Sequence, residues 1–138
     1  MMSRKQTLAS DVLAALEAKK LSLATAESCT GGGVGQALTA VPGSSRVYRG
    51  GIISYTNEVK SGLLHVPETL LRDLGAVSGP VAEAMARGAQ AALSADVAVS
   101  TTGLAGPGGD GFGNPVGTVW IACAGPGGVE SVLCRFQG

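Results

Sequence analysis

The chain has 138 residues, and its 10 Lys and Arg balance its 10 Asp and Glu, so the formal net charge is zero with only 14% charged residues. This length predicts a single domain over residues 1–138, and the absence of clustered positive charge from the sequence argues against nucleic acid or an anionic membrane surface as a main partner. With 45% hydrophobic but only 4% aromatic residues, the chain is too apolar to be disordered, and its core must be packed from Ala, Val, Leu and Ile.

The first half of the chain alternates helices and strands. Apolar residues at helical spacing predict an amphipathic helix over 6–19. A short apolar stretch over 21–26 has the length of a buried strand and leads directly into the glycine-rich segment 27–33. The other elements predicted in this half are a helix over 34–41, a turn over 42–45, a strand over 47–55 and a short helix over 58–64.

The second half contains a long helix and ends in paired strands. Apolar residues recur every four positions from Val81 to Leu93, after the helix-start signals Ser78 and Pro80. Because helices alternate with strands early and strands follow one another late, we predict an α/β fold, a three-layer α/β/α domain on a mixed sheet. The other elements are a helix over 67–74, a strand over 95–101, a glycine loop over 103–115 and an antiparallel hairpin of strands 116–124 and 129–136.

Histidine and cysteine are too scarce for most metal and redox sites. His65 is the only histidine, and Cys29, Cys123 and Cys134 form no Cys-x-x-Cys pair, so we expect neither a bound metal nor another cofactor. Three scattered cysteines are typical of reduced thiols. The N-terminal segment 1–20 does not have a signal-peptide core, and no apolar run approaches the ~20 residues that span a bilayer. We therefore expect a cytoplasmic location.

Glycines mark where a ligand is expected. Of the 22 glycines, seven lie from Gly31 to Gly51 and seven from Gly103 to Gly117. Both groups lie at or near the ends of predicted strands, and open α/β sheets place ligand sites at the carboxyl ends of their strands. The sequence therefore predicts a site between the two groups.

Ser28 lies between a predicted strand and a helix opened by glycines, where backbone N–H groups can hold an oxyanion or a phosphate. An ordinary helix cap with glycines for a tight turn explains the pattern equally well.

Tyr55 and Lys60 lie near the first turn of the next predicted helix. A solvated surface lysine is the simpler interpretation of Lys60, because a helix terminus supplies only ~0.3 to 1 kcal/mol of the roughly 4 kcal/mol that bring the pKa of a lysine near 7. A lysine base at this position would have to be buried.

The segment 106–111 fits the pattern G-x-G-x-x-G in form only. It precedes a predicted strand and not a helix, and Pro107 lacks an N–H donor. We favour a mobile loop that shapes a pocket over a dinucleotide site. Thr102 and Gly103, just before the loop, offer a hydroxyl and a backbone N–H at a strand end.

Six blocks, in order along almost the whole chain, together resemble the CinA C-terminal domain family. That family includes nicotinamide mononucleotide amidohydrolases, so the resemblance implies hydrolysis of this nucleotide's carboxamide to nicotinic acid mononucleotide and ammonia, without metal. A pyridine nucleotide is then the expected small-molecule partner. The blocks are TAESCTGG at 25–32, PGSS at 42–45, YTNEVK at 55–60, GAVS at 75–78, TGLAGPGG at 102–109 and PVGTVW at 115–120.

The resemblance also implies roles for individual residues. A serine nucleophile falls on Ser28, and a lysine with a nearby tyrosine falls on Lys60 and Tyr55, so Lys60 deprotonates Ser28 directly or through Tyr55. Thr102 and Gly103 match a threonine and glycine at the family's pocket. The further candidates are Thr30, Gly31 and Gly32 for the oxyanion, and Arg46, Gly106 and Gly108 for the substrate's phosphate.

Two family features are expected to be missing here. Many relatives carry an additional N-terminal domain, whose activity we do not carry over, and the family continues past residues 136–138 with a closing helix. Without that helix we expect exposed apolar sheet surface, which favours a homodimer or larger assembly. Two alternatives to the amidohydrolase stay open: an amidase for another small carboxamide, and a non-catalytic nucleotide-binding or competence-associated regulatory module.

Overall fold

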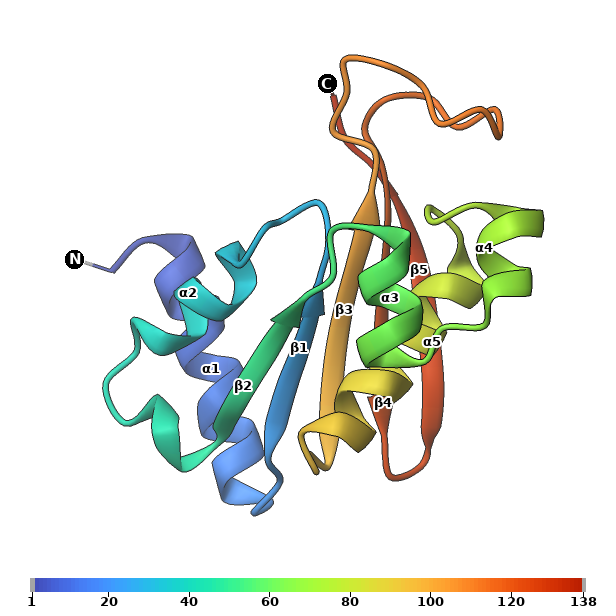
Figure 1. The fold of residues 1–138 in the computed structure, drawn as a ribbon. Coiled ribbons are helices and arrows are strands. Elements are labelled where there is room, and N and C mark those ends of the chain that lie inside the picture. Colours follow the sequence, from blue (N-terminus) through green and yellow to red (C-terminus); the bar gives the residue numbers. More distant parts are fainter. Residues whose placement is uncertain (1, 138) are drawn as a thin grey trace.

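The computed structural model describes residues 2–137 and places one five-stranded sheet between two groups of helices (Figure 1). The strand order is β2-β1-β3-β4-β5. Both β2 (Tyr48–Ile53) and β3 (Val97–Gly103) pair in parallel with the central β1 (Leu23–Glu27), whereas β4 (Thr118–Gly125) and β5 (Gly128–Arg135) form an antiparallel hairpin against β3. The predicted α/β fold on a mixed sheet is therefore confirmed.

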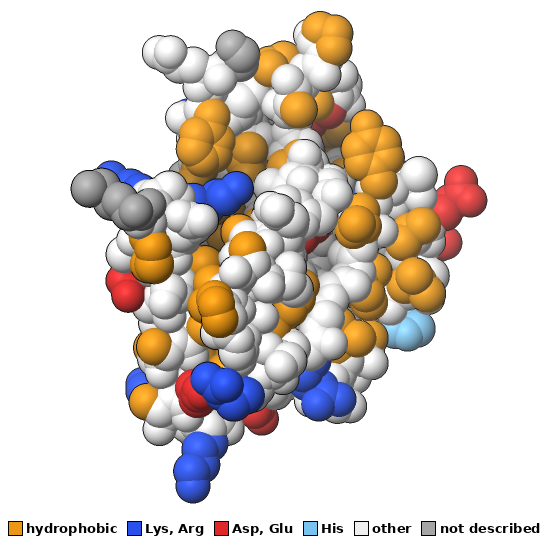
Figure 2. Space-filling model, turned by 90° about the vertical axis from the view of Figure 1, so that its left-hand side faces the viewer, with side chains coloured by type: hydrophobic (Ala, Val, Ile, Leu, Met, Phe, Trp, Pro, Cys, Tyr) orange, Lys and Arg blue, Asp and Glu red, His pale blue; other side chains and the backbone are white. Residues whose placement is uncertain are grey.

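One face of the sheet is covered by α1 (Arg4–Ala18) and α2 (Gly33–Thr39). Ser3 and Gln6 form a reciprocal capping box that starts α1. Leu13 of α1 and Leu38 of α2 pack with Leu23 of β1. Figure 2, which views the side that carries these helices, shows hydrophobic side chains scattered between polar ones, and a shallow groove between α1 and α2 is lined partly by Leu8 and Val34.

The other face is covered by α3 (Asn57–Leu64), α4 (Glu68–Leu74) and α5 (Gly79–Ala92). Ser78 caps α5, as its sequence position predicts, and Val81, Met85 and Ala89 at four-residue spacing are fully buried. At Gly88 an added Cβ would collide with the backbone carbonyl of Leu64. Only glycine therefore lets α5 pack this closely against the end of α3.

Alanine pairs bring α5 close to the hairpin. Ala82 and Ala86 of α5 pack against Ala122 and Ala124 of β4 in a separate buried cluster. Small side chains allow a close approach of helix and sheet, which is the core that a composition poor in aromatics predicts.

The boundaries differ from the predicted ones in two places that matter for the site. The residues after Ile53 leave the sheet and turn into α3, although the apolar pattern continues to Tyr55. The 42–45 turn leads into a short 3-10 helix, η1 (Ser44–Arg46), just before β2. None of the helices formed by residues 2–137 has both the length and the hydropathy needed to cross a bilayer.

The long glycine loop after β3 extends beyond the carboxyl ends of the parallel strands (Figure 1). The Asn114 side-chain amide donates to the carbonyl oxygen of Val77 at 3.2 Å, and the ring of Phe112 lies against Gly75. Both contacts fasten the loop to the segment between α4 and α5.

Candidate active site

Ser28 and Lys60 meet at the carboxyl end of β1. Ser28 directly follows this strand, and its backbone N–H donates to the carbonyl of Thr101 in β3 at 3.0 Å. Lys60 reaches it from α3, and its Nζ atom lies 3.1 Å from Ser28 Oγ. Both side chains are buried, with exposed fractions of 7% for Ser28 and 1% for Lys60. The structure thus brings together the two residues that the sequence separates by 32 positions.

The start of α3 directs Lys60 inward. Thr56 caps this helix, which begins at Asn57, by accepting a hydrogen bond from the Val59 N–H at 3.2 Å. Leu64, one turn after Lys60, is buried in the core with α5. The lysine side chain is consequently carried by the buried face of the helix, and the interpretation of Lys60 as a solvated surface residue is wrong.

Burial of Lys60 makes its charged form less favourable than it is in water. Burial lowers the pKa of this lysine from its ordinary value, and only a weaker opposing effect comes from Cys29. The Nζ atom lies 2.7 Å from the carbonyl oxygen of Ser54 and 3.2 Å from that of Tyr55. A neutral amine has two N–H bonds and one lone pair. In the neutral form of the amine, with both N–H bonds directed to these carbonyls, the lone pair can accept a hydrogen bond from the Ser28 hydroxyl.

A second buried group, the Glu27 carboxylate, lies on the opposite side of the strand end, and sequence reasoning missed it. The side chain is 3% exposed. It accepts hydrogen bonds from Thr30 Oγ1 at 2.6 Å and from the backbone N–H groups of Gly32 at 3.2 Å, Val34 at 2.9 Å and Gly35 at 2.9 Å. The signal that could have found it is an acidic residue at the last position of a buried strand, directly before a turn with free N–H groups.

These hydrogen bonds narrow the set of predicted oxyanion donors. The N–H of Gly32 is committed to Glu27, and the N–H of Gly31 donates to the Ser28 carbonyl at 3.2 Å. In the hydrogen-bond network of residues 2–137, the backbone N–H groups of Cys29 and Thr30 donate to no oxygen, although both lie near enough to the Cys29 sulfur to lower its pKa. Among the three predicted donors, Thr30 is therefore the residue whose amide is available.

Thr102 and Gly103 lie beside Ser28, as predicted. The register pairs Glu27 with Thr101, so Thr102 is next to Ser28 along the adjacent strand. Its buried hydroxyl donates to the carbonyl of Ala76 at 2.8 Å. A Cβ at Gly103 would come within 3.0 Å of Cys29 Sγ, so this glycine leaves room for the residue after the serine.

Tyr55 contacts Lys60 through its backbone. Its carbonyl accepts from the lysine amine, while the side chain is 75% exposed and makes no hydrogen bond to Ser28 or Lys60. The Tyr55 phenol is therefore not placed to relay a proton between Ser28 and Lys60 in this structure. The direct contact of Lys60 with Ser28 is the one present.

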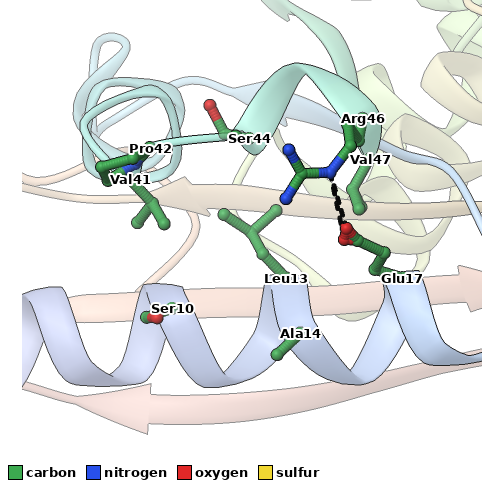
Figure 3. Close-up of a pocket in the computed structure, with 10 residues that line it drawn as sticks. Ser10, Leu13, Ala14, Glu17, Val41, Pro42, Ser44, Arg46 and Val47 are labelled. Carbon is green, nitrogen blue, oxygen red and sulfur yellow. Dashed lines mark hydrogen bonds and ion pairs between the residues drawn. The ribbon is translucent and has the colours of Figure 1, made fainter.

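Arg46 lies away from this site. It belongs to η1 at the amino end of β2, whereas Ser28 follows the carboxyl end of the parallel strand β1. Its Nε donates to Glu17 of α1 at 2.7 Å, beside a separate pocket of about 190 Å³ (Figure 3). The prediction that Arg46 holds a phosphate beside Ser28 is wrong for this chain's own site, because a turn that precedes a strand lies at the opposite edge of a parallel sheet.

Gly106 and Gly108 belong to the glycine loop, and their role in phosphate binding stays a prediction. Gly106 has a φ of +90° and lies against Val116, whereas a side chain at Gly108 would meet nothing within 4 Å. The part of the chain that the structure describes contains no cluster of three or more His, Cys, Asp or Glu side chains suited to a metal ion.

Cys29 is a free, half-buried thiol beside the serine. Burial raises its pKa, with a smaller lowering from backbone hydrogen bonds and from Lys60. A raised thiol pKa opposes formation of the thiolate nucleophile. The raised pKa makes Cys29 the weaker candidate nucleophile, and the hydrogen bond with Lys60 is made by Ser28.

Comparison with known proteins gives a consistent result. The family model described as the CinA C-terminal domain matches residues 5–138. A "CinA-like protein" of Parasynechococcus marenigrum (strain WH8102) is 54% identical over 130 residues, which cover 94% of this chain and 31% of that protein. A second one, from Cyanothece sp. (strain PCC 7425), is 53% identical over 136 residues, 98% of this chain and 32% of its own. The chain spans about a third of the length of the curated relatives it matches.

Solved structures agree in fold. A competence/damage inducible protein from Agrobacterium tumefaciens has a TM-score of 0.93 and 38% identity, over 99% of this chain and 84% of that one. A competence-damaged protein (CinA) superfamily protein from Escherichia coli has a TM-score of 0.95 and 36% identity, over 100% of this chain and 82% of that one.

Proposed function

We propose a function for this chain on the premise that it belongs to the CinA C-terminal domain family. The proposal is that the domain hydrolyses a carboxamide, and that its substrate is nicotinamide mononucleotide, which it converts to nicotinic acid mononucleotide and ammonia. The single observation that carries the proposal is the buried Ser28–Lys60 contact of 3.1 Å at the carboxyl end of the central strand.

The first half of the proposed reaction forms an ester. The Ser28 hydroxyl proton moves to the neutral Nζ of Lys60 while Oγ forms a bond to the carboxamide carbon. The resulting tetrahedral oxyanion is stabilised by the backbone N–H groups of Cys29 and Thr30, which donate to no oxygen in the structure. Lys60 then returns the proton to the amide nitrogen, the C–N bond breaks and ammonia leaves.

The second half hydrolyses that ester. Water replaces ammonia, and Lys60 takes its proton as the hydroxide oxygen attacks the same carbon. The bond to Ser28 Oγ breaks, the serine recovers the proton, and the carboxylic acid is released. No group outside the chain, water and substrate is required to balance either half.

Burial explains why a lysine suits this role. A solvated lysine is almost fully protonated at neutral pH and cannot accept a proton. Ser28 and Lys60 belong to a site whose low exposure lowers the pKa of the amine, and a base with a pKa closer to the working pH transfers protons most effectively. The buried amine would otherwise be a costly feature of the fold.

A second candidate, a non-catalytic nucleotide-binding or regulatory module, is favoured by the descriptions of solved relatives as competence or damage inducible proteins. A regulatory function, however, gives no role to the buried contact between Lys60 and Ser28. Calorimetry separates the two functions, since the regulatory module predicts binding of the nucleotide without release of ammonia.

The experiment that tests the proposal measures ammonia release from nicotinamide mononucleotide. The wild type and Ser44→Ala, a serine of η1 outside the site, are expected to release ammonia at similar rates. Ser28→Ala is expected to release none above the background. Full activity in Ser28→Ala would contradict the serine mechanism.

A further inference from the structure

We propose that Glu27 is a positioning residue for the Ser28 nucleophile, an inference that rests on the proposed function of Ser28. Its carboxylate does not face the reacting atoms. Its role is to hold the turn after Ser28 in one conformation, so that the serine hydroxyl stays directed at Lys60 and the N–H groups of Cys29 and Thr30 stay in position for the oxyanion.

The environment of Glu27 is unusual for a carboxylate. Four donors converge on its two oxygens, three of them backbone N–H groups and the fourth the Thr30 hydroxyl. Neither of the two ion pairs formed by residues 2–137 includes it. An ionised carboxylate only accepts hydrogen bonds, so four donors match this form of the side chain. A protein seldom buries a carboxylate in this way without a cation.

The hydrogen bonds of Glu27 fasten both sides of Ser28. Before the serine, the Glu27 carbonyl accepts from the Ser54 N–H at 2.7 Å. After the serine, the Glu27 side chain holds Thr30 and the first residues of α2. Ser28 and Cys29 are thus a short bridge between two fixed points, which restricts the directions open to the serine side chain.

The same residue links the nucleophile to the base. The Ser54 N–H donates a hydrogen bond to the Glu27 carbonyl at 2.7 Å, and the Ser54 carbonyl accepts one from the Lys60 amine, also at 2.7 Å. The turn that carries Ser28 and the segment that orients Lys60 therefore share one attachment point.

Thr101 extends this network below the turn. Its Oγ1 lies 2.8 Å from Thr30 Oγ1, which in turn donates to Glu27. Because each hydroxyl can donate one proton, Thr101 donates to Thr30 and Thr30 donates to the carboxylate. The chain of three groups ties β3 to the turn and leaves the Thr30 side chain with one orientation.

The Glu27 carboxylate also argues against binding of the substrate's phosphate at the start of α2. A substrate phosphate at this seven-residue helix would have to displace the internal carboxylate from the N–H groups of Val34 and Gly35. Two negative groups at one helix end repel each other. Glu27 therefore reserves these N–H groups for structure, and the substrate's phosphate must be held elsewhere.

The test compares Glu27→Gln with a matched control, Asp96→Asn. Asp96 also accepts two hydrogen bonds, from the Ser22 N–H and hydroxyl, but it lies at the opposite end of the sheet. Two rates are measured for each folded variant: ammonia release from nicotinamide mononucleotide, and modification of Ser28 by an alkyl fluorophosphonate followed by peptide mass mapping. The second rate needs no substrate.

We expect Glu27→Gln to lower kcat and the rate of Ser28 modification together, by roughly 10- to 100-fold, because a displacement of about 1 Å costs up to 10²-fold. KM is expected to stay within about twofold of the wild-type value. The pH midpoint of the rate is expected to shift by no more than a few tenths of a pH unit, since Lys60 is unchanged. Asp96→Asn is expected to leave both rates within twofold. Glu27→Asp, which keeps the charge but shortens the side chain, is expected to behave like Glu27→Gln.

Modification of Ser28 at the wild-type rate in a folded Glu27→Gln variant would overturn the positioning role. If Glu27 variants do not fold, Thr30→Val decides: it removes one donor to the carboxylate at almost constant volume, and an unchanged modification rate would again overturn it. Failure of the proposed function gives a different result, in which the wild type itself is not modified at Ser28 and Ser28→Ala still releases ammonia.

Discussion

The Lys60 amine lies 3.1 Å from the Ser28 hydroxyl oxygen and is held there by two backbone carbonyls, those of Ser54 and Tyr55. When the amine is neutral, its two N–H bonds can be donated to the two carbonyls, which leaves its lone pair for the serine hydroxyl. This geometry supports the proposed role of Lys60 as the base.

Lys60→Met is expected to lower kcat for ammonia release by about 10² to 10⁴-fold, the usual range for loss of a general base. Methionine fills a similar volume, so the fold should be retained. The matched control is Lys19→Met, which changes an exposed lysine at the end of α1. A loss of only twofold in Lys60→Met would show that the amine is not the base.

The rate is expected to rise with pH up to the lowered pKa of Lys60 and then level off, because only the neutral amine accepts the serine proton. Since burial moves this pKa below 10.5, the midpoint should fall below the range of a solvated lysine. A pH profile of kcat/KM, from about pH 5 to 10, provides the measurement. A midpoint at the value of a free lysine would contradict the neutral, buried base.

The free energy of unfolding is expected to depend on pH, because the pKa of Lys60 is lower in the folded state than in the unfolded chain. Between the lowered pKa of the folded state and the ordinary value of 10.5, the unfolded chain binds more protons, so the free energy of unfolding should rise with pH. Below the lowered pKa both states are protonated and this contribution is lost. Urea unfolding of the wild type and Lys60→Met should therefore show a difference that changes only within this window.

Tyr55→Phe is expected to lower kcat less than Lys60→Met and to leave the pH midpoint in place. The reason is that the backbone carbonyl contacts the amine, and this substitution leaves the carbonyl unchanged. Steady-state kinetics of the two variants, measured side by side, decide the matter. Equal losses would indicate that the phenol turns inward during the reaction.

Gly88→Ala is expected to destabilise the fold and misplace Lys60, because the new Cβ would collide with the Leu64 carbonyl at the end of α3. Gly62→Ala is the control: it lies in the same helix as Lys60, and its Cβ would meet nothing within 4 Å. Replacing a helical glycine by alanine without a clash should stabilise by roughly 0.5 to 1 kcal/mol. The thermal unfolding temperature is expected to fall below the wild-type value in Gly88→Ala and to rise above it in Gly62→Ala.

Periodicity predicted most of the fold, because it reports directly which face of an element is buried. The four-residue spacing from Val81 onward is an example, since it follows the buried face of α5. The mixed sheet followed from the order of the elements. Residues 2–137 do not test the expectation about the family's closing helix.

The site was harder to predict, because it depends on contacts between distant segments. The burial of Lys60 results from the packing of α3 on α5, which the local sequence does not report. Glu27 was missed because its donors become apparent only when the turn to α2 is folded. Arg46 was misplaced because a motif close to a strand does not say at which edge of the sheet it lies.

The most direct test of the account is the mass of the Ser28 peptide after a reaction with nicotinamide mononucleotide is quenched by acid within the first turnovers. A nucleophilic Ser28 predicts an acyl adduct on this peptide in the wild type, and none in Ser28→Ala. Steady release of ammonia by the wild type, combined with an adduct on Cys29 or with full activity of Ser28→Ala, would contradict the central claim that Ser28, activated by Lys60, is the nucleophile.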